Sequence, residues 1–486
     1  MLELHNYIAG EWSAPGVELP QQICNANTGE VLLQQRGSTP VQISTAIDAA
    51  VKVHREGTWR NLSGDERAAH MLRIGDAIEE LIKDIASVDA ITTGVPITHT
   101  QTLARVCGIA FRTAAKLSRE SSSIRRETDF EIERLPLGPA AIIAPWNAPA
   151  GIACHKLASA LAAGCPVLFK PSEWAPLSGQ LITQAISKLD LPRGLFQLIH
   201  GDGMTGAALA GDPRVAAVSF TGGLEAGRAV AASCAHQIKP AQLELGGNNP
   251  LVILPDADLA PSVDGVVASL TTLNGQWCRA LGRLIVHEDL HDDVVETVLH
   301  RLNSLVIGDS RDHETEMGPM VHRQHRDHVL AAISDYEQLG GTVHRAGTLP
   351  ELAGWFLQPT LVTGVAPADA LGEIFGPVAT VHKFSNTDEA VSLANLAPYG
   401  LAAYVFGGQT NAYTVAKQIE AGMVKINSVT LFSPHPDAPR PAWKMSGMGE
   451  EGTRETFEFF RGSRVVGAPQ GIPASAAAEQ LQGTGT

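Results

Sequence analysis

The amino-acid sequence predicts a doubly wound α/β fold, and two observations lead to this prediction. Short apolar runs typical of strands alternate with helix-like segments through the middle of the chain, a pattern that favours mainly parallel sheets covered by helices. The chain has 486 residues, 44% of them hydrophobic and 18% charged, which is enough for about three domains or lobes with sizeable cores. Because such sheets bind ligands at the carboxyl ends of their strands, the loops there are the places to look for chemistry.

The elements follow one another in a regular order. Predicted strands cover 140–144, 167–169, 196–199, 215–220, 251–254 and 284–286, and predicted helices cover 151–163, 178–189, 223–236, 292–305 and 322–339. Residues 123–135 alternate polar and apolar side chains, as a two-stranded arm would, and 461–467 form a short late strand. Both are candidate sheet edges that pair with another subunit.

Composition excludes several classes of protein. The formal net charge is −15, which argues against a nucleic-acid partner or an anionic membrane surface. The most hydrophobic stretch, 138–169, contains several prolines and an asparagine that a bilayer would not tolerate, so no membrane association is expected. Six scattered cysteines and the lack of a signal peptide favour a reducing, cytoplasmic location without disulfides, and no metal site is expected.

Two residues are candidates for nucleophile and base. Cys278 lies on a glycine-containing turn between predicted elements, where a helix end could stabilise a thiolate, although an isolated cysteine is more often a small buried hydrophobe. Glu244 stands at a predicted strand end before two glycines. A partly desolvated carboxylate there has a raised pKa and can act as a general base, whereas a solvated edge glutamate is an equally good interpretation.

Three further loops follow predicted strands. Pro145-Trp-Asn-Ala-Pro149 is a stiff loop in which Asn147 either donates to a developing oxyanion or satisfies its own backbone. Lys170 and Glu173 stand at a strand end where they could bind ribose hydroxyls. Phe220-Thr-Gly-Gly223 opens a helix whose backbone N–H groups could bind a pyrophosphate.

These motifs occur in one order along the chain, together with Glu-Leu-Gly-Gly at 244–247, Gly-Gln-Trp-Cys at 275–278, Glu373-Ile-Phe-Gly-Pro377 and Lys444-Met-Ser-Gly447. The ordered set resembles the aldehyde dehydrogenase superfamily over nearly the whole length. The resemblance implies two doubly wound parallel-sheet domains plus a small β oligomerisation arm. It assigns 1–117 and 138–245 to an NAD-binding domain, 246–445 to a catalytic domain, and 118–137 and 446–470 to the arm. The composition of 471–486 predicts a flexible tail.

The resemblance also implies roles for single residues. Cys278 would be the nucleophile, Glu244 the base, Asn147 the oxyanion donor, and Lys156 a lysine near the relay to the base. The residues expected to bind the cofactor are Trp146, Lys170, Glu173, Gly203, Gly206, Phe220, Thr221, Gly222, Gly223, Leu245, Gly246, Glu373 and Phe375. The residues expected to line the substrate pocket are Ala148, Ile152, His155, Trp277 and Arg279, with the 432–435 loop. A homodimer or homotetramer is expected.

Some features depart from the family pattern or point elsewhere. The usual Pro-Phe-Gly-Gly-x-Lys is Pro439-Arg-Pro-Ala-Trp-Lys444 here, which leaves the conformation of that loop open. Gly201-Asp-Gly-Met-Thr-Gly206 fits a dinucleotide fingerprint, but in the resembled family this segment flanks the adenine. Three histidines at 322, 325 and 328 share one helix with charged neighbours, so we expect a solvated surface and not a metal site.

The sequence predicts the cofactor in more detail than the substrate. A carboxylate at Glu173 would repel a 2′-phosphate, which favours NAD over NADP. The substrate is expected to be a small aldehyde, and the flat side chains of Trp277 and His155 suggest an aromatic one. Arg279 either attracts the carboxylate of a semialdehyde or is an outward-facing or ion-paired residue, and the second interpretation is preferred. The alternatives are a CoA-acylating semialdehyde dehydrogenase, a non-catalytic scaffold and an unrelated thiol hydrolase.

Overall fold

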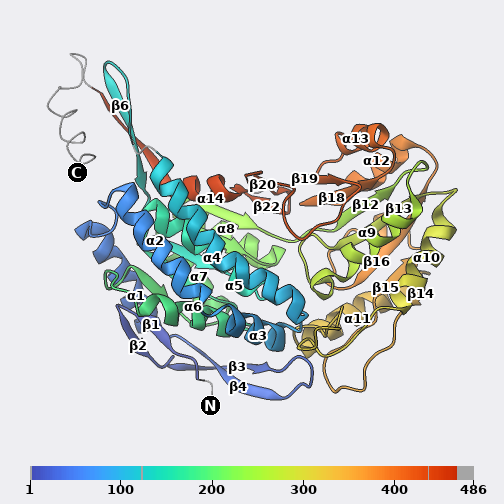
Figure 1. Cartoon of the computed structure of the whole chain (residues 1–486), viewed down its shortest axis with the longest axis horizontal. Coiled ribbons are helices and arrows are strands. Elements are labelled where there is room, and N and C mark those ends of the chain that lie inside the picture. Colours follow the sequence, from blue (N-terminus) through green and yellow to red (C-terminus); the bar gives the residue numbers. More distant parts are fainter. Residues whose placement is uncertain (1–2, 122–123, 436, 468–486) are drawn as a thin grey trace.

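The structure, a computed structural model, describes residues 3–121, 124–435 and 437–467, so the predicted flexible tail lies outside the described residues. Two lobes lie side by side, each built on one sheet (Figure 1). The first sheet has the order β2-β1-β9-β8-β7-β10-β11-β22, with β9 to β11 parallel and β1, β2 and β22 antiparallel at its edges. Its strands are β1 (Asn6–Ile8), β2 (Glu11–Ser13), β7 (Ala140–Ile143), β8 (Val167–Lys170), β9 (Phe196–Leu198), β10 (Ala217–Thr221), β11 (Ala241–Glu244) and β22 (Gly447–Met448).

The second sheet has the order β14-β15-β16-β13-β12-β18-β19 and is parallel apart from β14. Its strands are β12 (Asn249–Ile253), β13 (Leu281–His287), β14 (Thr342–Arg345), β15 (Thr360–Thr363), β16 (Val378–Phe384), β18 (Ala402–Phe406) and β19 (Met423–Ile426). The chain passes from the first sheet to the second between β11 and β12, and only the four residues 245–248 separate Glu244 from the second sheet. The predicted α/β class with parallel-sheet lobes is therefore confirmed.

Helices cover both faces of each sheet, because alternate strand residues point to opposite faces. In β7, Ile142 packs in the core with the long helices α2, α4 and α5, whereas Ile143 packs in the core with α1 and α8. In β12, Ile253 belongs to the core of α9 and α10 and Val252 to that of α12 and α13. The helices are α1 (Pro40–Glu56), α2 (Gly64–Glu79), α3 (Ile82–Thr93), α4 (Ile97–Glu120), α5 (Pro149–Ala163), α6 (Leu177–Ser187), α7 (Gly203–Gly211), α8 (Leu224–His236), α9 (Leu259–Thr271), α10 (His291–Asn303), α11 (Arg323–Gln338), α12 (Thr387–Asn395), α13 (Gln409–Ala416) and α14 (Thr453–Phe459), with short 3₁₀ turns η1 (Thr272–Gly275) and η2 (Pro367–Asp369).

A slender arm stands out from the first lobe (Figure 1). It is an antiparallel sheet of β5 (Ile124–Arg126), β6 (Phe130–Pro136) and β24 (Arg461–Gly467), which joins the two segments expected to pair as edges. The stretch 446–470 is divided, since β22 completes the first sheet beside β11 while β24 joins the arm. Smaller ladders are β3 (Val17–Cys24) with β4 (Val31–Gly37), β17 (Tyr399–Gly400) with β21 (Trp443–Lys444), and β20 (Arg440–Pro441) with β23 (Glu450–Glu451).

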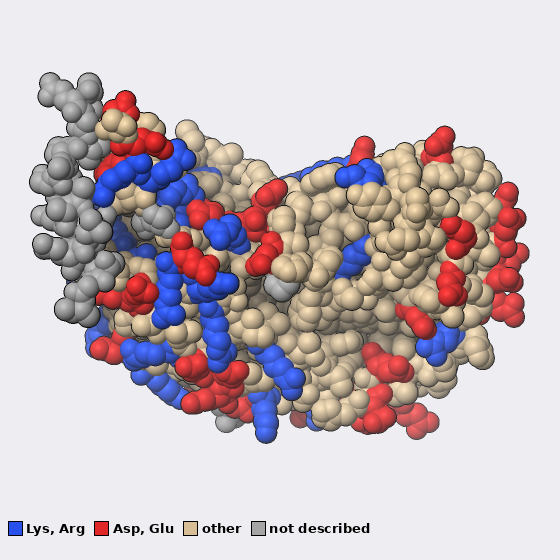
Figure 2. Space-filling view, turned by 45° about the horizontal axis from the view of Figure 1, so that its top comes forward, with Lys and Arg blue, Asp and Glu red and all other residues tan. Residues whose placement is uncertain are grey.

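The surface agrees with the acidic composition. On the face shown in Figure 2, Lys and Arg are interspersed with Asp and Glu over the first lobe, and acidic side chains border the far edge of the second. None of the described helices is both long enough and apolar enough to cross a bilayer.

Candidate active site

A cavity of about 630 Å³ opens at the carboxyl ends of β7, β8, β10 and β11, where the two lobes meet. The structure places every residue expected to bind a cofactor in its wall: Trp146, Lys170, Glu173, Gly203, Gly206, Phe220, Thr221, Gly222, Gly223, Leu245, Gly246, Glu373 and Phe375. Asn147, Glu244 and Cys278 line the same cavity. The three candidate reactive groups therefore face one space, which they share with the candidate cofactor residues.

The wall of the cavity fits a dinucleotide. Helix α8 begins there with Gly223 as its N-cap and no side chain bonded to its first N–H groups, and such an end attracts a phosphate. A Cβ added to Gly223 or Gly203 would meet no heavy atom within 4 Å, so both leave space for a ligand. The Thr221 hydroxyl is buried without a hydrogen-bond partner and is available to one.

The other end of the cavity carries a charged pair. Lys170 Nζ lies 2.9 Å from Glu173 Oε2, and both side chains are mostly buried. The pair fixes the carboxylate beside the start of α7, where Asp202 accepts hydrogen bonds from the N–H groups of Met204 and Thr205. The glycine fingerprint of 201–206 thus opens a helix at the rim of the cavity instead of enclosing a phosphate.

The histidines at the start of α11 contradict the prediction of a solvated surface in part: His328 is exposed as expected, whereas His322 and His325 are half-buried. His325 and His328 line the cavity, and His322 stacks on Trp174 with ring centroids 3.7 Å apart. His325 Nε2 lies 2.8 Å from the carbonyl oxygen of Phe375, and burial lowers the pKa of His325 to about 4. Spacing of three along a helix did not reveal their neighbours, because Trp146, Trp174 and Phe375 come from distant loops. Within the described ranges no three His, Cys, Asp or Glu side chains are grouped to hold a metal ion.

A strained turn presents Cys278. Leu273, Asn274 and Gly275 have φ values of 51°, 60° and 71°, a left-handed run that costs energy for the two residues with side chains. Asn274 offsets this cost through hydrogen bonds of its buried amide. The amide donates to the carbonyl oxygens of Gly94 and Pro319 and accepts from the Gly318 N–H. Asn249, at the start of β12, holds the other side of the turn by donating to the carbonyl oxygens of Cys278 at 2.9 Å and Ala280 at 2.7 Å. Sequence reasoning missed both anchors.

The thiol and the carboxylate interact directly, and the amide is held beside the turn that carries the thiol. Burial raises the pKa of the Cys278 thiol well above its usual value, and the Glu244 carboxylate, which shares a hydrogen bond with it, raises that pKa further. Burial and the Glu451 carboxylate raise the pKa of Glu244, against the opposing charges of Arg279 and Lys156. Asn147 Nδ2 donates to the Gln276 carbonyl at 2.9 Å, which aligns the amide with the turn that carries Cys278.

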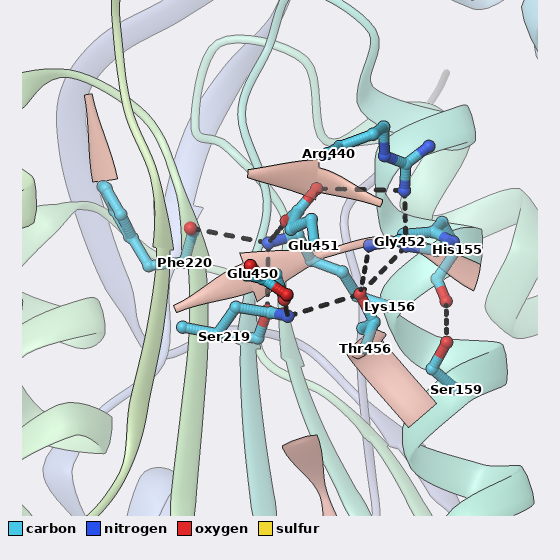
Figure 3. Close-up of polar contacts among 11 residues, drawn as sticks. His155, Lys156, Ser159, Ser219, Phe220, Arg440, Glu450, Glu451, Gly452 and Thr456 are labelled. Carbon is cyan, nitrogen blue, oxygen red and sulfur yellow. Dashed lines mark hydrogen bonds and ion pairs between the residues drawn. The ribbon is translucent and has the colours of Figure 1, made fainter. Parts of the chain in front are cut away.

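The Lys156 and Glu451 charges that act on Glu244 belong to a buried ionic cluster that the sequence did not predict in full, and Figure 3 shows this cluster. Lys156, from α5, donates to Ser219 Oγ at 2.9 Å and pairs with Glu451 Oε1 at 2.5 Å. Lys156 is fully buried and Glu451 is 8% exposed. The pair explains why Lys156 is tolerated inside the lobe, since a buried charge needs a partner. Glu451 had no signal of its own, because Gly-Glu-Glu at 449–451 reads as a solvated turn.

The loop that departs from the family pattern joins this cluster. Arg440 Nη2 lies 2.7 Å from His155 Nε2 and 4.0 Å from Glu451 Oε2. His155 Nε2 also lies 3.2 Å from Thr456 Oγ1. Burial and the Arg440 charge lower the pKa of His155 to about 3, so the ring is neutral and accepts the Arg440 hydrogen bond. Pro439-Arg-Pro-Ala is therefore held to α5 by its arginine.

The residues expected to line the substrate pocket do not all line the cavity. Ile152 lines the cavity, whereas Ala148, His155, Trp277 and Arg279 do not. Trp277 packs in an apolar cluster with Val95 and Leu273. The preferred interpretation of Arg279 is wrong: the residue is 7% exposed and forms no ion pair with a described carboxylate.

Comparison with known proteins agrees with this geometry. A sequence model described as the aldehyde dehydrogenase family matches residues 13–466. The chain belongs to the aldehyde dehydrogenase family. It is 33% identical to a geranial dehydrogenase of Castellaniella defragrans over 475 residues, covering 95% of this chain and 98% of that one. A betaine aldehyde dehydrogenase of Rhizobium etli is 34% identical, covering 90% and 92%.

The solved structures include a betaine aldehyde dehydrogenase from Staphylococcus aureus in complex with NAD+. It superposes with a TM-score of 0.91 at 30% identity, covering 96% of this chain and 95% of that one. The predicted family, fold and enzyme class, an aldehyde dehydrogenase, are therefore confirmed.

Proposed function

We propose that this aldehyde dehydrogenase uses NAD to oxidise an aldehyde to a carboxylic acid, with Cys278 as nucleophile and Glu244 as base. The observation that carries the proposal is the convergence of Cys278, Glu244 and Asn147 on the cavity lined by the candidate cofactor residues. NAD+ is bound in the related solved structure. Glu173, held by Lys170 at the adenosine end, favours NAD over NADP because a carboxylate repels a 2′-phosphate.

The residues divide the chemistry into two stages. Glu244 takes the Cys278 proton, and the thiolate attacks the aldehyde carbon to form a thiohemiacetal. The Asn147 amide and the Cys278 N–H stabilise its oxyanion, which typically contributes about 10²–10³ in rate per donor. Bound NAD supplies the hydride acceptor that converts this adduct to a thioester. Glu244 releases that first proton to solvent and then removes a proton from water, which attacks the thioester carbon; the C–S bond breaks, which releases the acid and returns the Cys278 thiolate.

Glu244 separates this proposal from its alternatives. A CoA-acylating dehydrogenase passes the thioester to CoA and has no need of a base for water, whereas here a buried carboxylate with a raised pKa stands against the nucleophile. A scaffold has no need of a strained turn anchored by Asn274 and Asn249. A thiol hydrolase has no need of an open glycine, Gly223, before α8.

We extend the proposal to the domain organisation, the oligomeric state and the location of the protein. The expected division into cofactor domain, catalytic domain and arm follows the two sheets and the β5–β6–β24 arm. Val465 and Val466 are 65% and 43% exposed on β24, so the arm offers an apolar edge to a second subunit. Light scattering should give the mass of a homodimer or homotetramer, and Val465→Lys should lower it. The cytoplasmic location remains a prediction, in keeping with six free cysteines.

The test is NADH formation from a panel of aldehydes, by the enzyme and by Cys278→Ala. We expect activity with NAD that Cys278→Ala abolishes, while Cys234→Ala, at a buried thiol in α8, keeps it. Turnover by Cys278→Ala, or a requirement for CoA, would contradict the proposal.

A further inference from the structure

Arg279 is a buried cation without an ion pair to any carboxylate that the structure describes. Its side chain follows Cys278 directly, is 7% exposed, and leaves Nε buried without a hydrogen-bond partner. No carboxylate of the described ranges lies within ion-pair distance of it. Since burying an unpaired charge costs several kcal/mol, such a residue points to an anion that is supplied from outside the chain.

The charge of Arg279 acts on the reacting groups. It lowers the pKa of the Cys278 thiol and of Glu244, against the larger raising effect of burial. Its backbone is fixed, because the Tyr404 hydroxyl donates to the Arg279 carbonyl at 2.8 Å. Its effect on both groups means that the guanidinium lies near the sulfur to which an aldehyde would bond.

A second buried cation lies close by. Lys425, on β19, is 5% exposed and donates only to uncharged oxygens, the carbonyls of Thr430 and Phe432 and the Thr430 hydroxyl. Burial and the Arg279 charge lower the pKa of Lys425 to about 8. The two cations make this region attractive to a negative charge, and neither has a carboxylate of the described residues at ion-pair distance.

The anion is not the cofactor. Arg279 does not line the cavity that holds the candidate cofactor residues, and the helix end suited to a pyrophosphate lies at Gly223. The remaining ligand at Cys278 is the aldehyde itself. A cationic substrate would be repelled by Arg279, and a neutral one would leave it unpaired.

We propose that Arg279 binds the carboxylate of the substrate, so that this enzyme oxidises short semialdehydes, which carry an aldehyde and a carboxylate in one molecule. The inference rests on the proposed oxidation at Cys278 and adds the substrate class to it. The guanidinium pairs with a planar carboxylate through two parallel hydrogen bonds, and Lys425 adds attraction from one side.

The kinetic test compares succinic semialdehyde with butanal, which lacks the carboxylate, alongside betaine aldehyde and benzaldehyde. We expect kcat/KM for succinic semialdehyde to exceed that for butanal by about 30-fold or more. Arg279→Gln should remove the preference, chiefly through KM, and Arg279→Lys should restore part of it. Arg301→Gln, at an exposed arginine of α10, is the matched control and should leave the ratio unchanged.

Alkylation of Cys278 gives a readout that needs no turnover. Iodoacetate carries a carboxylate and iodoacetamide is its neutral counterpart, so Arg279 should favour iodoacetate, and Arg279→Gln should lower the rate ratio by about tenfold. The inference would be overturned if Arg279→Gln lowered kcat/KM equally for succinic semialdehyde and butanal, and lowered alkylation equally for iodoacetate and iodoacetamide. A preference of the enzyme for benzaldehyde, butanal or betaine aldehyde would overturn it as well. If the enzyme oxidised none of the aldehydes but still reacted preferentially with iodoacetate, that result would refute the proposed function and leave the anion site standing.

Discussion

The two sides of Cys278 differ in how they are built. On the cofactor side, all thirteen expected residues line one cavity, and five of them are glycines. On the opposite side, four of the five expected pocket residues lie off that cavity, and cationic side chains are prominent: Arg279, Lys425, and Arg440, which donates to the neutral ring of His155. A nucleotide cradle depends on local loop conformation, whereas the substrate side depends on which distant side chains meet. The first can therefore be predicted from motifs in single loops, whereas the second needs the packed structure.

Glu244 stands at the boundary between the two sides, and its replacement should have the largest effect. In the proposed mechanism Glu244 activates water for thioester hydrolysis, so Glu244→Gln should reduce steady-state turnover by about 10²–10⁴-fold. At high pH the Cys278 thiolate can form without this base. Rapid mixing of Glu244→Gln with NAD and aldehyde at high pH should therefore still show one equivalent of NADH in the first turnover. Equal losses in the first and later turnovers at every pH would instead assign Glu244 to the attack step alone.

Glu451 tests whether the buried charges behind Glu244 also hold the fold. Breaking the pair with Lys156 by Glu451→Gln should destabilise the protein by about 3–5 kcal/mol near neutral pH. Burial opposes the Glu451 charge, but Lys156, Arg440 and His155 outweigh it and lower the pKa from 4.5 to about 2. The stabilisation is thus present above pH 4.5 and is lost as the pH falls towards 2.

Urea denaturation across that range measures the effect. The difference between the wild type and Glu451→Gln should shrink as the solution becomes more acidic. The exposed neighbour Glu450 offers a matched control, since Glu450→Gln should change stability little at any pH. A constant difference down to pH 3 would mean that Glu451 acts through packing and not through its charge.

Much of the fold follows from sequence pattern, and the reasons for its gaps are physical. The strands at 140–144, 167–169 and 251–254 lie where predicted, because buried parallel strands are short apolar runs between turns. The long helix α4 received no prediction, since it begins after Pro96 without a side-chain cap and carries polar residues in its first turns. The sequence signals that usually mark the start of a helix are absent from such a segment.

The site was predicted where motifs lie in single loops and missed where they join distant ones. Glu451 meets Lys156 across 295 residues of sequence, and Asn249 reaches the Cys278 turn from another strand. Arg279 shows the same limit, because adjacency to Cys278 is visible in the sequence but the absence of a counterion is not. Only the packed structure shows that none of its described neighbours carries the opposite charge at ion-pair distance.

Glu173 gives a smaller effect confined to the cofactor side. Its carboxylate is held by Lys170 at 2.9 Å, so Glu173→Gln removes the repulsion of a 2′-phosphate and frees the lysine to bind one. The ratio of kcat/KM for NADP to that for NAD should rise by about tenfold, which corresponds to about 1.4 kcal/mol. Lys170→Met in the same background should reverse the gain, and an unchanged ratio would place the adenosine elsewhere in the cavity.

The smallest expected effect is a shift in the titration of Cys278, and it tests whether both sides act on one thiol. Burial, followed by the Glu244 carboxylate, raises the pKa of Cys278, while Arg279 lowers it. Glu244→Gln should therefore move the pH midpoint of iodoacetamide alkylation down, and Arg279→Gln should move it up. Because the two charges act on the sulfur from different residues, the double variant should lie between the singles. If neither single variant moves the midpoint, burial alone sets the reactivity of the thiol, and the opposing charges act on the substrate instead.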